Sequence, residues 1–125
     1  MAITYSTALR NRRADGITTE LGGLAKIKLY TVADVLLVTG VCSNPIAPAA
    51  ASGVLTFSAI TAGTTVAAGT ATKATITKSD DTVVISGLVV TAISGSGDVK
   101  LDDTNVLGSG QVVNFSSCII TQGNP

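Results

Sequence analysis

Apolar and polar residues alternate just after residue 23 of the chain. Ala25, Ile27 and Leu29 are apolar, and lysines separate them. A period of two is typical of a strand with one buried face and one wet face. Further strands are expected at about 35–41, 54–60, 71–78, 82–90, 98–101 and 110–121, between Gly, Ser, Asp or Pro residues. Short strands at such intervals predict an all-β fold of the sandwich, jelly-roll or small-barrel type.

The first part of the chain follows a helical period instead. Ser6 is a suitable N-cap, and Gly22-Gly23 ends the pattern, so we predict one N-terminal helix over residues 6–22. Gly16 weakens this helix by about 1 kcal/mol relative to Ala, which means that it needs a packing partner. The apolar residues expected to share its buried face are Leu9, Ile17 and Leu21.

The rest of the chain contains one proline-containing loop and no linker between domains. Residues 44–53 contain Pro45 and Pro48 among alanines, so they are expected to form an extended loop, because proline sustains neither a helix nor a central strand. No linker-like tract separates two domains. We therefore predict a single domain over residues 1–125, with its β-sandwich part at residues 25–121.

Composition limits the chemistry of the protein. The chain has no histidine, and aromatic residues make up 3% of it. Without histidine there can be no His-dependent triad and no His-ligated metal. We expect no enzymatic activity, no metal and no cofactor. A core of small apolar side chains often gains burial from neighbouring subunits, so we expect a homo-oligomer, a dimer or a trimer.

The N-terminal segment predicts synthesis in the cytoplasm, where cysteines normally stay reduced. Residues 1–13 lack the apolar region of a secretion signal, and the longest aliphatic runs are far shorter than the ~20 residues of a membrane helix. We expect no membrane segment. Cys42 and Cys118 are expected to be reduced and Cys118 to be buried, and a disulfide is possible only if the fold brings the two together.

The zero net charge hides an asymmetry along the chain. Residues 1–28 hold five basic and two acidic residues, a net +3, and residues 29–125 hold three basic and six acidic residues, a net −3. Every arginine lies within four positions: Arg10, Arg12 and Arg13. These three are the predicted partner-binding residues, because arginine forks pair with carboxylates of a docked protein or a neighbouring subunit. A plain solvated helix face is the alternative. Nucleic-acid binding is not expected from three charges without interleaved aromatics.

The acidic residues of the β part are better explained by turns than by a catalytic or metal site. Asp98, Asp102 and Asp103 follow a Gly/Ser segment but lack the spacing of a calcium loop, and their carboxylates are expected to bond nearby backbone amides. Asp80-Asp81 is expected at the tip of a hairpin between residues 71–78 and 82–90.

The N-terminal segment reads Ser6-Thr7-Ala8-Leu9-Arg10-Asn11 and continues through Arg13, Asp15 and Ile17. It resembles the opening of a family of small virion proteins of tailed bacteriophages, associated with capsid decoration or cement proteins. The resemblance spans nearly the whole chain, which departs from the family at Arg12, Gly16 and Lys73-Ala74-Thr75. The other matching segments are Ile27–Thr31, Gly53–Thr56, Ala59–Thr61, Gly69–Thr72, Gly97–Leu101 and Gly110–Val113.

The resemblance implies a β-sandwich or jelly-roll-like protein on the outer surface of a phage head, synthesised in the host cytoplasm. Its implied partner is the major capsid protein, and its implied role is to staple neighbouring capsomers. Two alternatives are a tail or head–tail structural component and a ligand-binding β module on a virion or cell surface. The shortage of aromatic platforms argues against sugar recognition by such a module.

Overall fold

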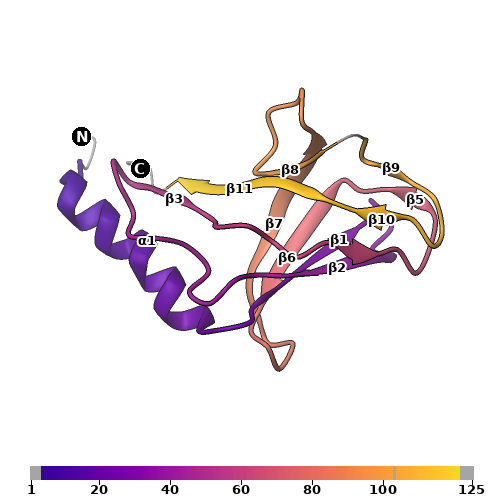
Figure 1. Ribbon diagram of the computed structural model, residues 1–125. Coiled ribbons are helices and arrows are strands. Elements are labelled where there is room, and N and C mark those ends of the chain that lie inside the picture. The colour runs from indigo at the N-terminus through magenta and orange to yellow at the C-terminus, as the bar shows by residue number, and fades with distance from the viewer. Residues whose placement is uncertain (1–3, 103, 122–125) are drawn as a thin grey trace.

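The computed structural model describes residues 4–102 and 104–121, which form one helix and a set of mostly short strands. The elements in chain order are α1 (Thr7–Leu21), β1 (Lys26–Tyr30), β2 (Leu36–Val41), β3 (Val54–Thr56), β4 (Gly63–Thr64), β5 (Gly69–Thr70), β6 (Lys73–Thr77), β7 (Val83–Ala92), β8 (Val99–Leu101), β9 (Val106–Leu107), β10 (Val112–Val113) and β11 (Phe115–Thr121). In Figure 1, α1 lies at one end of the molecule beside β3, and β5, β9 and β10 lie at the other end. The predicted mainly-β fold with one short helix is confirmed.

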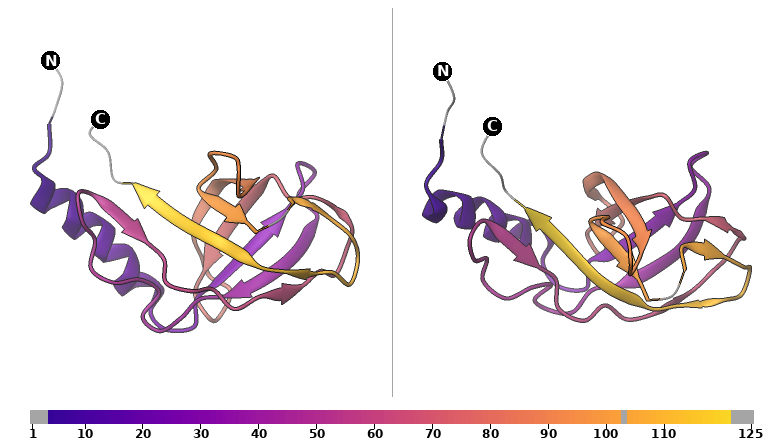
Figure 2. Two further views of the ribbon diagram at one scale, coloured as in Figure 1. Left: turned by 45° about the horizontal axis from the view of Figure 1, so that its top comes forward. Right: turned by 90° about the horizontal axis from the view of Figure 1, so that it is seen from above.

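Seven strands form a curled mixed sheet in the order β2-β1-β6-β7-β8-β11-β3. All neighbours are antiparallel except β7 and β8, which run parallel. Just beyond β3, the Thr61 N–H donates to the Val41 carbonyl of β2 at 2.8 Å. The chain that leaves the edge strand β3 therefore pairs with β2, the strand at the other edge of the sheet. The resulting curvature is visible in Figure 2. The small ladders β4–β10 and β5–β9 complete the β structure of the described residues.

The predicted strands differ from the observed ones where pairing is short. Of the strand expected at 54–60 only β3 forms, and the one expected at 110–121 is divided into β10 and β11. The two-residue strands β4, β5 and β9 were not predicted at all. Two residues cannot display a period, so only the tertiary pairing of such segments defines them.

The core follows the predicted alternation in β1. Ile27 and Leu29 are fully buried, while the neighbouring lysines keep partial contact with solvent. The 44–53 segment is a loop, as predicted, yet it also contributes Ile46 and Ala47 to the core. Apart from Phe57, the fully enclosed side chains are aliphatic or small, in keeping with the low aromatic content.

One aromatic ring packs across the curl of the sheet. Phe115 of β11 packs on Gly40 of β2, although these two strands are not neighbours in the sheet. A Cβ on Gly40 would lie 2.5 Å from Phe115 Cε1 and 3.1 Å from Ile60 Cγ2. Glycine at this position therefore allows the ring to fill the space between the opposed strands.

We predict that Gly40→Ala lowers the free energy of unfolding by about 1–3 kcal/mol, because the new methyl group overpacks against the ring. Chemical denaturation measures the change, and adding Phe115→Leu should recover part of it. Gly16→Ala is the matched control: its Cβ meets nothing within 4 Å, so helix propensity should make this variant more stable by about 1 kcal/mol. A Gly40→Ala protein as stable as the parent would contradict the packing described.

Candidate partner-binding surface on the N-terminal helix

The solvent side of α1 presents two arginines around a leucine. Leu9, Arg12 and Arg13 are all exposed, Leu9 to 43% of its full area. Residues three and four apart are neighbours on a helix surface, so Arg12 and Arg13 both lie next to Leu9. We call these three residues the outer face of α1. Ser6 fixes the start of the helix by accepting a hydrogen bond from Leu9 N at 3.2 Å.

The three predicted arginines are not equivalent in the structure. Arg10 is half-buried, and its Nη2 donates to Thr7 Oγ1 at 3.3 Å. Arg13 stacks over the Tyr5 ring, with 5.1 Å from Cζ to the ring centroid, a cation–π contact that leaves its charge uncompensated. Within the described residues, Arg12 makes no ion pair. Arg12 and Arg13 are thus the members of the predicted site that can meet a partner, and Arg10 lies on the side toward the body.

Two polar side chains one helical turn apart fasten the helix to the β body. Asn11 Oδ1 accepts a hydrogen bond from Gly53 N, and Asp15 Oδ1 accepts one from Ala50 N, both at 2.7 Å. Each bond satisfies a backbone amide of the 44–53 loop. In the sequence, the only indication of this role is that the two residues are four positions apart and so share a helix face. A sequence does not directly indicate that a side chain will bond a loop amide 35 or more positions away.

The buried side of α1 differs from the predicted one. Ala14 and Leu21 are buried and Ile17 is partly buried, so Leu21 and Ile17 lie on the packed side as expected. The prediction for Leu9 was wrong. The helix is turned so that the small Ala14 contacts the body between Asn11 and Asp15, which leaves Leu9 on the far side.

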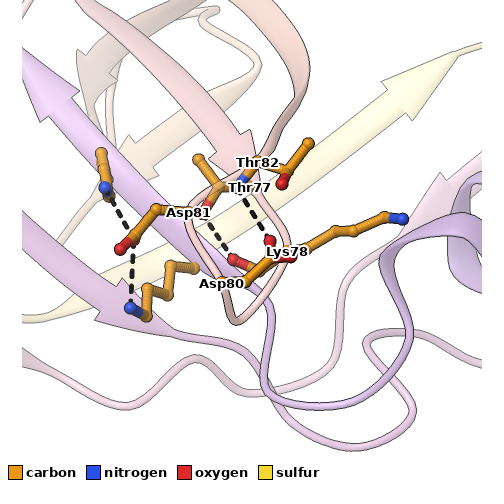
Figure 3. A network of polar contacts seen from close by, with 7 residues as sticks. Thr77, Lys78, Asp80, Asp81 and Thr82 are labelled. Carbon is orange, nitrogen blue, oxygen red and sulfur yellow. Dashed lines mark hydrogen bonds and ion pairs between the residues drawn. The ribbon is translucent and has the colours of Figure 1, made fainter.

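Most charges of the body are compensated within the chain. Lys26 Nζ and Lys28 Nζ lie 3.1 and 2.8 Å from Asp81 Oδ1 (Figure 3). Hydrogen bonds from Lys28 and then Lys26 lower the pKa of Asp81 below its ordinary value. Lys78 pairs with Glu20 of α1 at 3.1 Å. Both lysines of residues 1–28 are therefore paired with a carboxylate of the β part, and the arginines of the outer face of α1 remain.

Asp80, Asp81 and Asp98 of the β part lie in turns, as expected. Asp80 and Asp81 lie in the turn between β6 and β7, and the Thr82 N–H donates to Asp80 Oδ1 at 3.0 Å. Asp98 Oδ2 accepts from Val89 N at 3.0 Å, which confirms the turn interpretation for that residue. Asp102 is exposed, and Asp103 lies outside the described residues.

The described residues offer little reactive chemistry. Cys42 and Cys118 are both free and buried, and burial raises the pKa of each thiol from 9.0 to about 12, with a smaller effect of Cys42 on Cys118. Over residues 4–102 and 104–121, no three Cys, Asp or Glu side chains gather as a metal site would require. In that same part of the chain, no helix has the length and apolar character needed to cross a membrane.

We predict that removing either fastening side chain loosens the helix. Asn11→Ala or Asp15→Ala leaves a loop amide without its acceptor, which should cost about 1 kcal/mol of unfolding free energy and accelerate hydrogen exchange at Gly53 or Ala50. Nuclear magnetic resonance of the exchanging amides measures this site by site. Thr19→Ala, which removes a hydroxyl bonded only to the helix's own Asp15 carbonyl, should leave both amides protected. Equal protection in all three variants would show that the two bonds do not hold the loop.

The buried thiols predict a loss of stability in alkali. Between pH 9 and pH 12 the unfolded chain releases thiol protons that the folded chain retains, so the free energy of unfolding falls as pH rises. The slope should reach about 1.4 kcal/mol per pH unit for each thiol. Denaturation at several pH values, compared with a Cys42→Ala/Cys118→Ala variant, isolates the effect. An identical slope in the variant would assign the alkaline loss to other groups.

A scan against protein-family models, a search of curated proteins and a search of solved structures each found no match. The outer face of α1 is therefore defined by its exposed side chains and by the bonds that hold the helix on the body.

Proposed function

We propose that the protein is a structural component of a bacteriophage virion, a capsid decoration protein that binds the outside of the head and stabilises contacts between capsomers. The observation that carries this proposal is the outer face of α1. Arg12 and Arg13 flank an exposed leucine on a helix that Asn11 and Asp15 hold to the body. A helix fixed in this way presents its side chains in one orientation, which favours docking on a defined surface.

The chemistry of this face indicates the kind of surface it fits. Guanidinium groups pair bidentately with carboxylates, and a leucine between them needs a small apolar contact. The partner is therefore an acidic groove with an apolar floor, which we assign to the major capsid protein. A decoration protein needs only a modest contact area in each copy, because many repeated contacts on one shell act together.

The body supports the proposal in a more general way. A curled mixed sheet with a helix at one end is compatible with the β-sandwich or jelly-roll-like fold that the resemblance implies, and that finer fold assignment is part of the proposal. Self-association as a dimer or trimer is also part of it. Figure 1 shows β9 and β10 at the end opposite α1. Valines remain exposed on these two strands and in the segments that follow β1 and β4, where an apolar contact between copies would bury them: Val106, Val112, Val32 and Val66. The proposal includes no catalytic step, no cofactor and no direct contact with nucleic acid.

We predict that Arg12→Gln combined with Arg13→Gln weakens binding to heads that lack the protein by about tenfold or more, because the paired carboxylates lose their charged partners. Co-sedimentation with emptied mature heads gives the affinity. Lys100→Gln is the matched control, since Lys100 also carries a charge without an ion pair in the described residues but lies on β8. All variants should unfold at nearly the parent's temperature.

Three results would contradict the proposal. Absence of binding by the parent protein to such heads removes the decoration role. Labelling along the tail of intact virions, and not over the head, supports the tail component instead. Unchanged binding by the double variant, with a lowered unfolding temperature, assigns the arginines to the fold.

A further inference from the structure

A hollow of about 290 Å³ opens on the outward face of the sheet formed by β1, β6 and β7. Its walls come from the last residue of β1, the turn that follows, the first half of β6 and the middle of β7. They include Tyr30, Asp34, Lys73, Thr75, Ser86 and Gly87. Small-molecule sites generally measure roughly 300–1,000 Å³, so this hollow has room for one small ring.

The backbone of β7 forms one side of the hollow through a bulge. Ala74 pairs with Leu88 and Ile76 pairs with Ile85, so Thr75 is opposed by two residues, Ser86 and Gly87. Gly87 has φ +77°, and a Cβ placed on it would meet nothing within 4 Å. The space is therefore set by the backbone, because a residue with a side chain would be strained there and would partly fill it. Bulges of this kind are frequent next to binding sites, where they redirect side chains.

The charges around the hollow compensate one another. Lys73 forms an ion pair with Asp34 at the rim, and the nearby Lys28 is paired with Asp81. An anionic ligand would have to displace Asp34, and a cationic ligand would have to displace Lys73. The rim is thus suited to a neutral ligand whose groups both donate and accept hydrogen bonds.

Although the chain has few aromatic platforms, Tyr30 supplies the single aromatic wall that one sugar ring needs, and it stays in partial contact with solvent. The faces of aromatic rings pack well on apolar C–H surfaces, and the Tyr hydroxyl supplies a polar end. A pyranose ring has a C–H face for the tyrosine and vicinal hydroxyls for the Lys73 ammonium, the Asp34 carboxylate and the exposed Ser86 hydroxyl. We infer that this hollow, framed by Tyr30 and the Lys73–Asp34 pair, binds one neutral sugar ring, such as the terminal unit of a surface glycan.

This sugar site is separate from the surface proposed for docking on the head. The hollow lies on β1, β6 and β7, whereas the proposed docking residues lie on α1. Binding of glycans by a protein held on a particle would combine many weak contacts into useful avidity, so the single-site affinity can be low. We expect a Kd on the order of 1 mM for one ring.

A titration of the isotope-labelled full chain with a panel of methyl pyranosides tests the inference. Amide signals of Tyr30, Asp34, Lys73 and Gly87 should shift together for at least one neutral sugar, with saturation in the millimolar range. Tyr30→Ala should weaken that binding tenfold or more, and Asp34→Asn should weaken it as well. The matched controls are Tyr5→Ala and Asp80→Asn, which remove the same side chains elsewhere and should bind like the parent.

Unfolding temperatures for each variant identify any that fail to fold, and Ser86→Leu provides a second variant that occupies the hollow from an exposed position.

No shift with any pyranoside at concentrations well above the expected Kd overturns the inference. Binding that survives both Tyr30→Ala and Ser86→Leu places the sugar elsewhere and also overturns it. Tighter binding of a sugar phosphate or an amino sugar than of neutral pyranosides overturns the assignment of a neutral ligand. Head binding should be unchanged in Tyr30→Ala, so failure here is distinguishable from failure of the decoration proposal.

Discussion

The architecture depends on the contact between the two edges of the curled sheet. The hydrogen bonds between Val41 and Thr61 join the chain beyond β3 to β2, and this junction requires very close backbone approach. Glycines make the approach possible: Gly40 leaves room for the Phe115 ring, and a Cβ on Gly63 would collide with the carbonyl oxygen of Thr39. With few aromatics to fill an open interior, a tight curl lined by small residues is how this chain excludes water from its core.

Local patterns in the sequence were sufficient to predict the elements whose own residues show a clear period or capping residue. The alternation around Ile27 and Leu29 predicted β1, and Ser6 and Gly22 marked the ends of α1 within one residue. The orientation of that helix could not be predicted, because it follows from bonds between Asn11 and a loop 42 positions away. The hollow beside Tyr30 was equally inaccessible, since it arises from a bulge that exists only once β6 and β7 are in register.

The distribution of charge along the chain can be read from the sequence, but the ion pairs depend on the tertiary fold. The sequence distinguishes a basic first segment from an acidic remainder, and the fold then pairs Lys26 and Lys28 with Asp81, and Glu20 with Lys78. These exposed pairs add little stability each, because solvent screens them and ordering the side chains costs entropy. Their larger effect is on the surface. Most lysines are already paired with carboxylates, so the strongest uncompensated positive charge on the surface lies on the outer face of α1.

This arrangement separates the two proposed binding surfaces physically as well as chemically. The outer face of α1 offers uncompensated charge on a helix, which suits an acidic protein surface, whereas the hollow by Tyr30 offers balanced charge on a sheet, which suits a neutral ligand. β1 begins just after α1 and runs away from it, so Tyr30 lies at the end of that strand remote from the helix. A particle-bound protein that docks through α1 could therefore keep the hollow open to solvent. The length of β1, which separates Tyr30 from the helix, makes that combination possible.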